Sequence, residues 1–323
     1  NANPETGDAE IVIEGGVWNG NSAGNPRNKG LFDGGYSGAM IHFRNVRGLR
    51  MENVRLHNAE AYYARFTEVR DFQVEGIGFS SDTVRNNNDG IHLGGHCENG
   101  VIRNIRGLHP GVTGDDMVAL NADDALNRTE VRGMTCGPIR NILIEDLEAE
   151  GCHSFVRMLS VWSPIENVTV RGVRGSCEIA ALNCDAARGC RVLLFDEASP
   201  PFPDGVGCLR NILVSDFCVS KSAENDIALL RLLLELDRAD LAAGERDLGN
   251  LLGDAEHAGD AALLGHGVVA GNALDERIVD AVNGELVVRR QHLPDGGFAE
   301  DQVFLRRGRR QHHSRQGEGQ RGQ

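Results

Sequence analysis

Lysine is almost absent from this 323-residue chain, and basic residues as a group are outnumbered by acidic ones. Lys and Arg total 33 against 47 Asp and Glu, which gives a formal net charge of −14. Lys29 and Lys221 are the lysines of the sequence. Proteins that bind nucleic acid usually present a basic surface, so this balance argues against nucleic acid as a partner. No apolar run approaches the ~18 residues of a membrane-spanning helix, which argues against a membrane partner as well.

Motifs for metal binding and redox chemistry are also missing. None of the eight cysteines forms a Cys-x-x-Cys pair, which argues against a zinc ribbon or a thioredoxin-like site. We expect free, buried cysteines in preference to disulfides. His92, His96 and His109 lack a spacing that would place three ligands on one face. The sequence therefore predicts neither a metal nor another cofactor.

A short phrase recurs along the first two thirds of the chain: an Asn, an aliphatic residue and an alternating run. It occurs at Asn53, Asn104, Asn141, Asn167 and Asn211. Short strands between Gly, Asn and Asp turns, with little helical periodicity, predict an all-β chain. A period of ~20–25 residues indicates a solenoid, and the spacing fits neither a leucine-rich repeat nor a propeller. We therefore expect a right-handed parallel β-helix, with Asn141, Asn167 and Asn211 at comparable corners because Asn tolerates the left-handed conformation there.

The repeat stops near Lys221, so the sequence predicts a β-helix domain over residues 1–221 and an atypical tail over residues 222–323. The Leu-rich segment 226–243 predicts one helix, and the Arg-rich segment 306–323 is typical of disorder. Two interpretations of the tail stay open: a helical cap or dimerisation element, and out-of-frame translation of GC-rich DNA. In either case we expect the tail to contribute nothing to catalysis.

Two acidic segments are the strongest chemical signal. Asn87-Asn88-Asp89-Gly90 and Gly114-Asp115-Asp116 each place acids beside a Gly, directly before a short apolar strand. Asp89 and Asp115 are 26 residues apart, about one coil, so we expect their backbones on neighbouring rungs ~4.8 Å apart. Asp115 and Asp116 can share a groove only if one of them lies in a turn or bulge, which Gly114 permits. The alternative is that both segments are ordinary turns.

Three crowded carboxylates would raise the pKa of at least one of them and so place a proton donor beside a charged base. Glycoside hydrolysis needs such a pair, and inversion predicts carboxyl groups ~6.5–9.5 Å apart. The spacing alone does not choose which acid holds the proton.

These two segments, the second extended to Asn121, resemble the paired signature of the family 28 glycoside hydrolases, the polygalacturonase family. Segment 15–21 is similar to an early segment of that family, and the resemblance covers about residues 10–221. It implies a right-handed parallel β-helix and hydrolysis with inversion. It also implies that Asp115 is the general acid, that Asp89 and Asp116 position or activate water, and that Asn87 contacts substrate. We accordingly expect a secreted or periplasmic enzyme of pectin and cell-wall degradation, although no signal peptide is visible.

Two further motifs of that family are poorly matched. Its Gly-His-Gly is missing at the usual interval, and the nearest candidate for the site histidine is His153, with a partly buried corner histidine as the alternative. Its Arg-Ile-Lys is also missing, because no lysine lies between Lys29 and Lys221. Arg157 is our candidate for gripping a substrate carboxylate, with Arg188 and Arg191 as a second choice and an ordinary surface Arg as the alternative.

Three functions therefore compete. The first is an inverting glycoside hydrolase acting on a pectic polysaccharide or oligosaccharide. The second is a β-helix polysaccharide lyase, which would use Arg or Lys as base and hold Ca²⁺ with carboxylates. The third is a non-catalytic carbohydrate-binding β-helix. An unsaturated product would identify a lyase, and the sequence predicts no particular oligomeric state.

Overall fold

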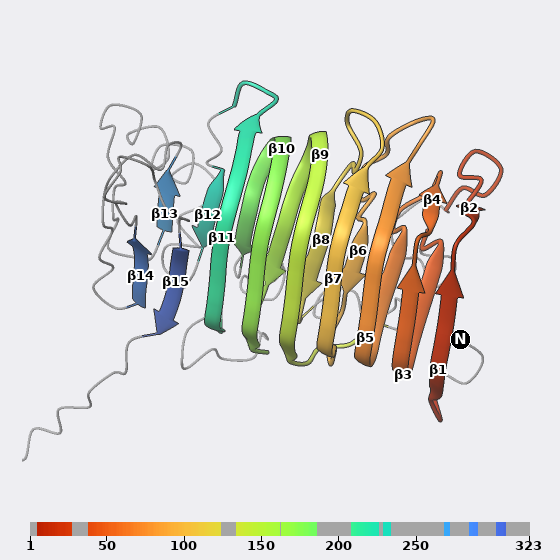
Figure 1. Cartoon of the computed structure of the whole chain (residues 1–323), viewed down its shortest axis with the longest axis horizontal. Coiled ribbons are helices and arrows are strands. Elements are labelled where there is room, and N and C mark those ends of the chain that lie inside the picture. Colours follow the sequence, from red (N-terminus) through yellow and green to blue (C-terminus); the bar gives the residue numbers. More distant parts are fainter. Residues whose placement is uncertain are drawn as a thin grey trace, which may run out of the picture.

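The computed structural model describes residues 5–27, 38–123, 134–161, 163–185, 208–225 and 229–233, together with three short strands nearer the C-terminus (Figure 1). All regular elements among these residues are strands. They are β1 (Asp8–Glu14), β2 (Val17–Asn19), β3 (Ile41–Glu52), β4 (Arg55–His57), β5 (Ala64–Ser80), β6 (Ile91–Leu93), β7 (Glu98–Gly107), β8 (Asp116–Asn121), β9 (Ile139–Leu159), β10 (Ile165–Asp185), β11 (Leu209–Lys221), β12 (Leu230–Leu233), β13 (Val268–Gly271), β14 (Gly284–Arg289) and β15 (Gln302–Arg307). No helix of the described residues is long and apolar enough to cross a membrane.

From β1 to β12 the chain turns in stacked coils, and each coil pairs in parallel with the next. The coil that carries β3 pairs with β5, and β5 pairs further on with β6 and β7. The same relation continues from β7 and β8 to β9, from β9 to β10 and from β10 to β11. One row of equivalent positions runs through Ile41, Ala64, Ile91, Val118, Val156 and Leu182. Within the described residues the prediction of all-β structure is confirmed, and the strands from β1 to β12 pair in parallel from one to the next.

The core is a set of apolar rows that run through the stack. Met51, Val74, Ile102, Ile144, Val170 and Val214 occupy equivalent positions, and all are buried. Gly100 interrupts a neighbouring row, where a Cβ would lie 2.0 Å from the ring of Phe72. The missing side chain leaves the room that this ring fills, which keeps the interior close-packed.

A row of amides marks one corner of the coils. Asn141, Asn167 and Asn211 all have positive φ. The Nδ2 of each donates to the residue one coil earlier at 2.9 Å: Asn211 to Asn167, Asn167 to Asn141, and Asn141 to Asn99. The prediction that these three residues lie at comparable corners is confirmed. Asn suits this position because it tolerates the left-handed conformation. Its side-chain amide can also hydrogen-bond to the Asn amide of the neighbouring coil.

Asn53 and Asn104 belong to a different corner, although the sequence analysis placed them in the same phrase. They align with Gly76, Asp146, Gly172 and Asp216, all with positive φ. Each of these long strands needs a left-handed residue at two positions five residues apart, such as Asn141 and Asp146 in β9, so one local signal marks two corners. Only the pairing register separates them.

Replacing Asn167 by Ala is expected to lower the free energy of unfolding by about 3–4 kcal/mol. The change removes two side-chain hydrogen bonds, worth about 1 kcal/mol each, and puts a Cβ-bearing residue without a local hydrogen bond in the left-handed region, at about 1–2 kcal/mol. Asn167→Gly loses the same bonds without that strain, so denaturant unfolding should place its stability between that of Asn167→Ala and that of the native protein. Equal stability of the two variants would contradict the conformational part of the argument.

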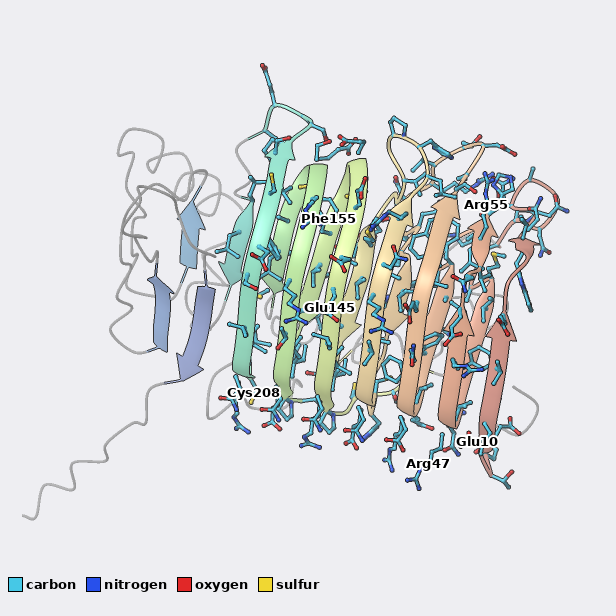
Figure 2. All side chains as sticks on the ribbon, viewed as in Figure 1. Glu10, Arg47, Arg55, Glu145, Phe155 and Cys208 are labelled. Atoms are coloured by element: carbon cyan, nitrogen blue, oxygen red, sulfur yellow. The ribbon has the colours of Figure 1, made fainter. Side chains whose placement is uncertain are left out.

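Arginine and acidic side chains alternate on the exterior of successive coils, where they form ion pairs between neighbouring coils. Arg103 Nη2 lies 2.7 Å from Glu75 Oε2, and Arg140 Nε lies 2.9 Å from Glu166 Oε2. Figure 2 shows Arg47 and Glu145 among these outer side chains. Exposed pairs of this kind stabilise a protein only slightly, yet like charges opposed on neighbouring rungs would disfavour the register.

The last coil departs from the sequence analysis. Segment 226–243 was predicted to be a helix, but Leu230–Leu233 forms β12, which pairs in parallel with β10. Leucine suits both structures, and pairing with the open edge of β10 satisfies the backbone of this segment. Residues 302–307 likewise form a strand, β15, that pairs antiparallel with β11. The rest of the predicted helix and residues 308–323 lie outside the described residues, and the boundary at residue 221 stays a prediction.

Candidate active site

Asp89 and Asp116 occupy the same position on neighbouring coils. The amide of Gly90 donates to the carbonyl of Asp116 at 2.9 Å, and β6 pairs with β8 at an offset of 27 residues, from Ile91 to Val118. The expected rung neighbour of Asp89 was Asp115, one residue earlier. The coil is one residue longer than the 26 counted from the sequence, so the register selects Asp116.

Asp115 lies in the bend directly before β8, which begins at Asp116. The hydroxyl of Thr113 donates to the carbonyl of Asp115 at 2.6 Å, and the amide of Asp116 donates to Asp115 Oδ1 at 3.1 Å. The sequence analysis required such a turn. Gly114 allows the backbone of this turn to pass close to Arg85, because a Cβ at Gly114 would lie 2.1 Å from the carbonyl oxygen of Arg85.

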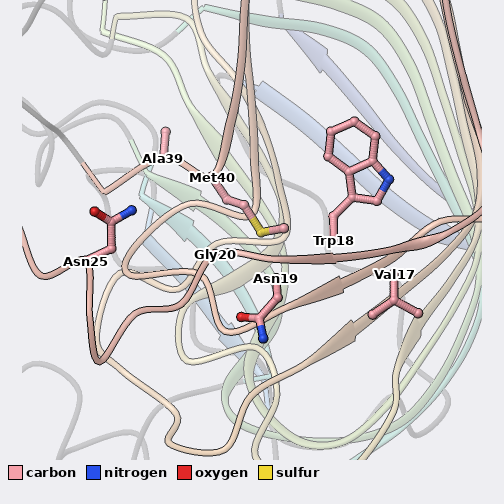
Figure 3. Close-up of a pocket in the computed structure, with 7 residues that line it drawn as sticks. All are labelled: Val17, Trp18, Asn19, Gly20, Asn25, Ala39 and Met40. Atoms are coloured by element: carbon pink, nitrogen blue, oxygen red, sulfur yellow. The ribbon is translucent and has the colours of Figure 1, made fainter.

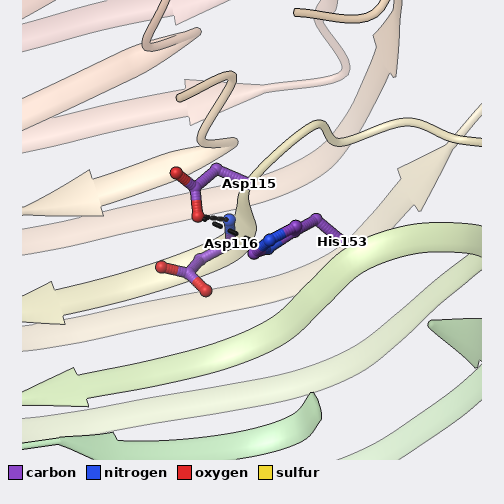
Figure 4. Close-up of side chains that lie close together, drawn as sticks. All are labelled: Asp115, Asp116 and His153. Carbon is purple, nitrogen blue, oxygen red and sulfur yellow. Dashed lines mark hydrogen bonds and ion pairs between the residues drawn. The ribbon is translucent and has the colours of Figure 1, made fainter. Parts of the chain in front are cut away.

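Asn87 and His153 flank the carboxylate of Asp115. Asn87 Nδ2 donates to Asp115 Oδ2 at 3.3 Å, and His153 Nδ1 lies 3.5 Å from Asp115 Oδ1. Figure 4 shows Asp115, Asp116 and His153 converging from β8, the bend before it and β9. One ligating atom from each of these three residues lies within 4.8 Å of the other two. His153 is placed here by its amide, which donates to the carbonyl of Thr113 at 2.9 Å.

His92 is a site residue that the sequence analysis missed. Its Nδ1 lies 2.6 Å from Asp89 Oδ2, and both residues are buried. Its ring meets the ring of Tyr62 edge-on, with centroids 4.7 Å apart. The sequence analysis considered His92 as a metal ligand and set it aside.

The other two histidines of that group lie apart from these acids and make local contacts. His109 Nε2 accepts the amide of Ser81 at 3.0 Å. The ring of His96 lies over Gly137, where a Cβ would come within 2.2 Å of Nε2. His92, His96 and His109 are therefore held by separate contacts in the described chain.

Arg157 lies on the next coil, at the outward position of β9 that pairs with Ala119 of β8. Its Nη1 is 3.9 Å from Asp116 Oδ2, and its side chain is partly exposed. The structure therefore brings this candidate beside the acids. Arg188 and Arg191 lie outside the described residues.

Burial dominates the protonation of this cluster. It raises the pKa of Asp89 to about 6, with the charge of Asp115 adding to the rise and the hydrogen bond to His92 opposing it. Burial also raises the pKa of Asp116 well above its ordinary range, again with Asp115 adding and Arg157 opposing. The sequence analysis assigned the retained proton to Asp115, whereas these shifts place it on the two buried acids. Carboxylates this close titrate as a unit.

The pH dependence of stability should report the buried carboxyl of Asp89. Its pKa is raised from 3.8 to about 6 in the folded protein, so folding favours its protonated form. This stabilisation is fully present below about pH 4, falls as the pH rises from about 4 to about 6, and is absent above that. Asp89→Asn cannot ionise, so its free energy of unfolding should fall less over that range than that of the native protein. Urea titrations at several pH values measure the two slopes, and equal slopes would refute the shift.

The cluster also bears on the predicted carboxyl spacing. Ligating oxygens of Asp115 and Asp116 lie within 4.8 Å. That is shorter than the ~6.5–9.5 Å between the carboxyl groups of many inverting enzymes, so the predicted spacing is wrong for this pair, and inversion stays a prediction that rests on the family resemblance. Two carboxylates and an imidazole could hold a divalent cation, and the same atoms suit proton transfer.

Comparison with known proteins gives a partial relationship. No family model matches the chain. Over 136 residues, 42% of this chain, it is 27% identical to Polygalacturonase QRT2 of Arabidopsis thaliana. The match covers 29% of that protein, so the chain spans well under half of its length. The chain is thus similar to a polygalacturonase over part of its sequence.

Two solved structures show weaker similarity. The family 28 exopolygalacturonase of Yersinia enterocolitica is 14% identical with a TM-score of 0.37, over 58% of this chain and 35% of that one. The catalytic unit of a GH87 alpha-1,3-glucanase from Streptomyces thermodiastaticus is also 14% identical, with a TM-score of 0.17, over 58% of this chain and 50% of that one. These TM-scores are too low to establish a common fold.

Proposed function

We propose that this protein is a right-handed parallel β-helix glycoside hydrolase that cleaves a pectic polysaccharide with inversion, in a secreted or periplasmic setting. The observation that carries the proposal is the gathering of Asp89, Asp115 and Asp116 from two neighbouring coils, with His153 and Arg157 on the next coil. An isolated pair of turns would not bring five such groups together. The partial identity to a polygalacturonase supports the same class.

Exposure separates the roles of the three acids. The side chain of Asp115 is 20% exposed, against 6% for Asp89 and 3% for Asp116. A general acid must reach the oxygen of a bulky leaving group, and carboxyl groups that titrate as a unit share their protons, so Asp115 delivers the proton of the cluster when that glycosidic bond breaks. Asp89 and Asp116 lie deeper and act on water, which adds to the anomeric carbon and gives up a proton. The pKa values of both buried acids are raised. Asp89 or Asp116 can therefore accept the proton of water only after one of them has ionised.

Asn87 and Arg157 complete the proposal as substrate contacts. Asn87 also orients Asp115 through its amide. A chain with a formal charge of −14 attracts an anionic polymer poorly at long range. A uronate substrate therefore requires a local cation, and Arg157 is the arginine beside the acids that has exposed surface to offer.

The test is reducing-sugar release from a panel of pectic and other polysaccharides by the native full chain. Hydrolysis of a pectic substrate without ultraviolet absorbance from an unsaturated product supports the proposal. Such absorbance would identify a lyase, and release from no substrate would leave a non-catalytic binding protein. Proton NMR of the first product decides the stereochemistry, and retention would overturn the inverting mechanism.

A further inference from the structure

The two buried acids of the cluster have different polar neighbours. Asp89 and Asp116 lie at equivalent positions on neighbouring coils, and their side chains are 6% and 3% exposed. Nδ1 of His92 lies 2.6 Å from Asp89 Oδ2. The cation beside Asp116 is Arg157, whose Nη1 is 3.9 Å from Asp116 Oδ2, which is beyond hydrogen-bond distance. This difference separates two acids that are otherwise placed alike.

The pairing register shows why His92 serves Asp89 and not Asp116. Ala39, Tyr62, Asp89 and Asp116 follow one another in a single row of the stack. Figure 3 shows Ala39 next to Met40 at a hollow near the N-terminal end of that row. His92 pairs in register with Ala119 of β8. The position that supplies an imidazole beside Asp89 therefore holds a methyl group, with no donor, beside Asp116.

Backbone contacts hold Asp89 where its side chain meets His92. Asn88 Nδ2 donates to the carbonyls of Ala59 and Ala61 at 3.0 Å and 2.6 Å, which fixes the loop to the preceding coil. The amide of Tyr63 donates to the carbonyl of Asp89 at 2.8 Å. The backbone of Asp89 is thus anchored, and the bond to the imidazole restrains its carboxyl group in turn.

Ionisable groups surround this pair on the coils before and after it. They are His42, Tyr62, Arg65, Asp115, Asp116 and Arg157. The ring of Tyr62 meets the imidazole edge-on, and Arg65 occupies the position of His92 one coil earlier. Burial lowers the pKa of His42 to about 3, with Arg65 adding to the fall, so His42 brings no charge near neutral pH.

The hydrogen bond from His92 favours the charged form of Asp89. An ionised carboxylate can only accept hydrogen bonds, so Nδ1 of His92 carries the hydrogen whenever Asp89 is ionised. Burial and the charge of Asp115 raise the pKa of Asp89, and this hydrogen bond is the largest influence that lowers it. Both partners are buried, so the bond is stronger than it would be in water.

We propose that His92 is a positioning residue that selects Asp89 as the acceptor of the water proton. The inference rests on the proposed function. His92 holds one carboxyl oxygen of Asp89, and the other oxygen takes the proton as an O–H bond of water breaks. The water oxygen bonds to the anomeric carbon, and the glycosidic oxygen leaves with the proton that Asp115 delivers. Asp116 keeps its proton throughout this step.

The test compares the pH profile of kcat for full-length His92→Leu and His92→Asn on the best pectic substrate. Leucine removes the donor, whereas the amide nitrogen of asparagine can replace Nδ1. His92→Leu should move the acidic limb up by about one pH unit, because the pKa of Asp89 rises further without this hydrogen bond. On that limb kcat should fall about tenfold while KM stays the same. His92→Asn should return the limb toward its native position.

His109→Gln is the matched control, because His109 lies apart from the acids and glutamine can still accept the amide of Ser81. If His92→Leu does not fold, His92→Gln takes its place, since its longer side chain puts the amide near the position of Nε2 instead of Nδ1. An acidic limb that stays in place in the variant without the Nδ1 donor, or that moves equally in His92→Asn, overturns the inference alone. Absence of hydrolysis by the native chain rejects the proposed function and the inference with it.

Discussion

Replacing Asp115 by Asn is expected to lower the rate of glycoside cleavage by roughly 10²–10⁴ while the protein stays folded. The amide keeps the size of the carboxylate but has no proton to transfer to the leaving oxygen. Its Oδ1 can still accept the amide of Asp116, and its surroundings at Asn87 and His153 stay polar. Removing the Asp115 carboxyl also eases the ionisation of Asp89 and Asp116, because the charge of Asp115 raises their pKa values.

Steady-state rates on the best pectic substrate measure this effect, with oligosaccharide affinity followed separately. The matched control is Asp82→Asn, which changes an acid with an 80% exposed side chain on a neighbouring loop and should leave turnover unchanged. An Asp115→Asn enzyme with ordinary activity would remove Asp115 from the proton donor's role. The pH profile of the native enzyme adds a second check, because its acidic limb should follow the deprotonation of the buried pair.

Replacing Gly90 by Ala is expected to cost about 3 kcal/mol or more of stability and to abolish cleavage in whatever protein still folds. A Cβ at Gly90 would lie 2.3 Å from the carbonyl oxygen of Met117 and 2.7 Å from the ring of Phe79. The first contact is with backbone on the next coil, so it cannot be relieved by a rotamer change. The coil would have to shift where Asp89 and Asp116 face each other.

Denaturant unfolding and activity measure the two consequences together. Gly94→Ala is the matched control, because Gly94 lies on the same coil and its nearest obstacle is the side-chain hydroxyl of Thr67 at 3.1 Å. That group can give way by a small movement, so the control should cost far less. A Gly90→Ala protein as stable and as active as the control would show that the coils do not approach as closely as described.

The strands and their parallel pairing were predictable because successive coils repeat the same local requirements. Every corner needs a left-handed residue, and Asn supplies one at Asn141, Asn167 and Asn211, where the amide row then forms. The same residue type also occurs at a second corner, so the sequence wrongly grouped Asn53 and Asn104 with the other three. Leu230–Leu233 shows the opposite case, because leucine favours a helix by propensity but pairing with the strand edge of β10 decided the structure of this segment.

The acids could be selected from the sequence, since Asp89, Asp115 and Asp116 stand beside glycines at an interval of about one coil. His92 could not, because a histidine on an outward strand position carries no signal until its neighbour is known. Its partner Asp89 is three residues away in the sequence. His92 Nδ1 lies 2.6 Å from Asp89 Oδ2, and both side chains are buried.

The sequence by itself determined the repeat, the all-β class, the corner residues and the chemical identity of the acidic cluster, because each depends on residue type at a fixed interval. The tertiary structure alone decided which acid faces which and where the proton is held. A coil of 27 residues instead of 26 puts Asp116, not Asp115, opposite Asp89. Burial beneath neighbouring coils then raises the pKa values of Asp89 and Asp116 while Asp115 stays partly exposed. Desolvation depends on what covers a group in space, and no local pattern records that.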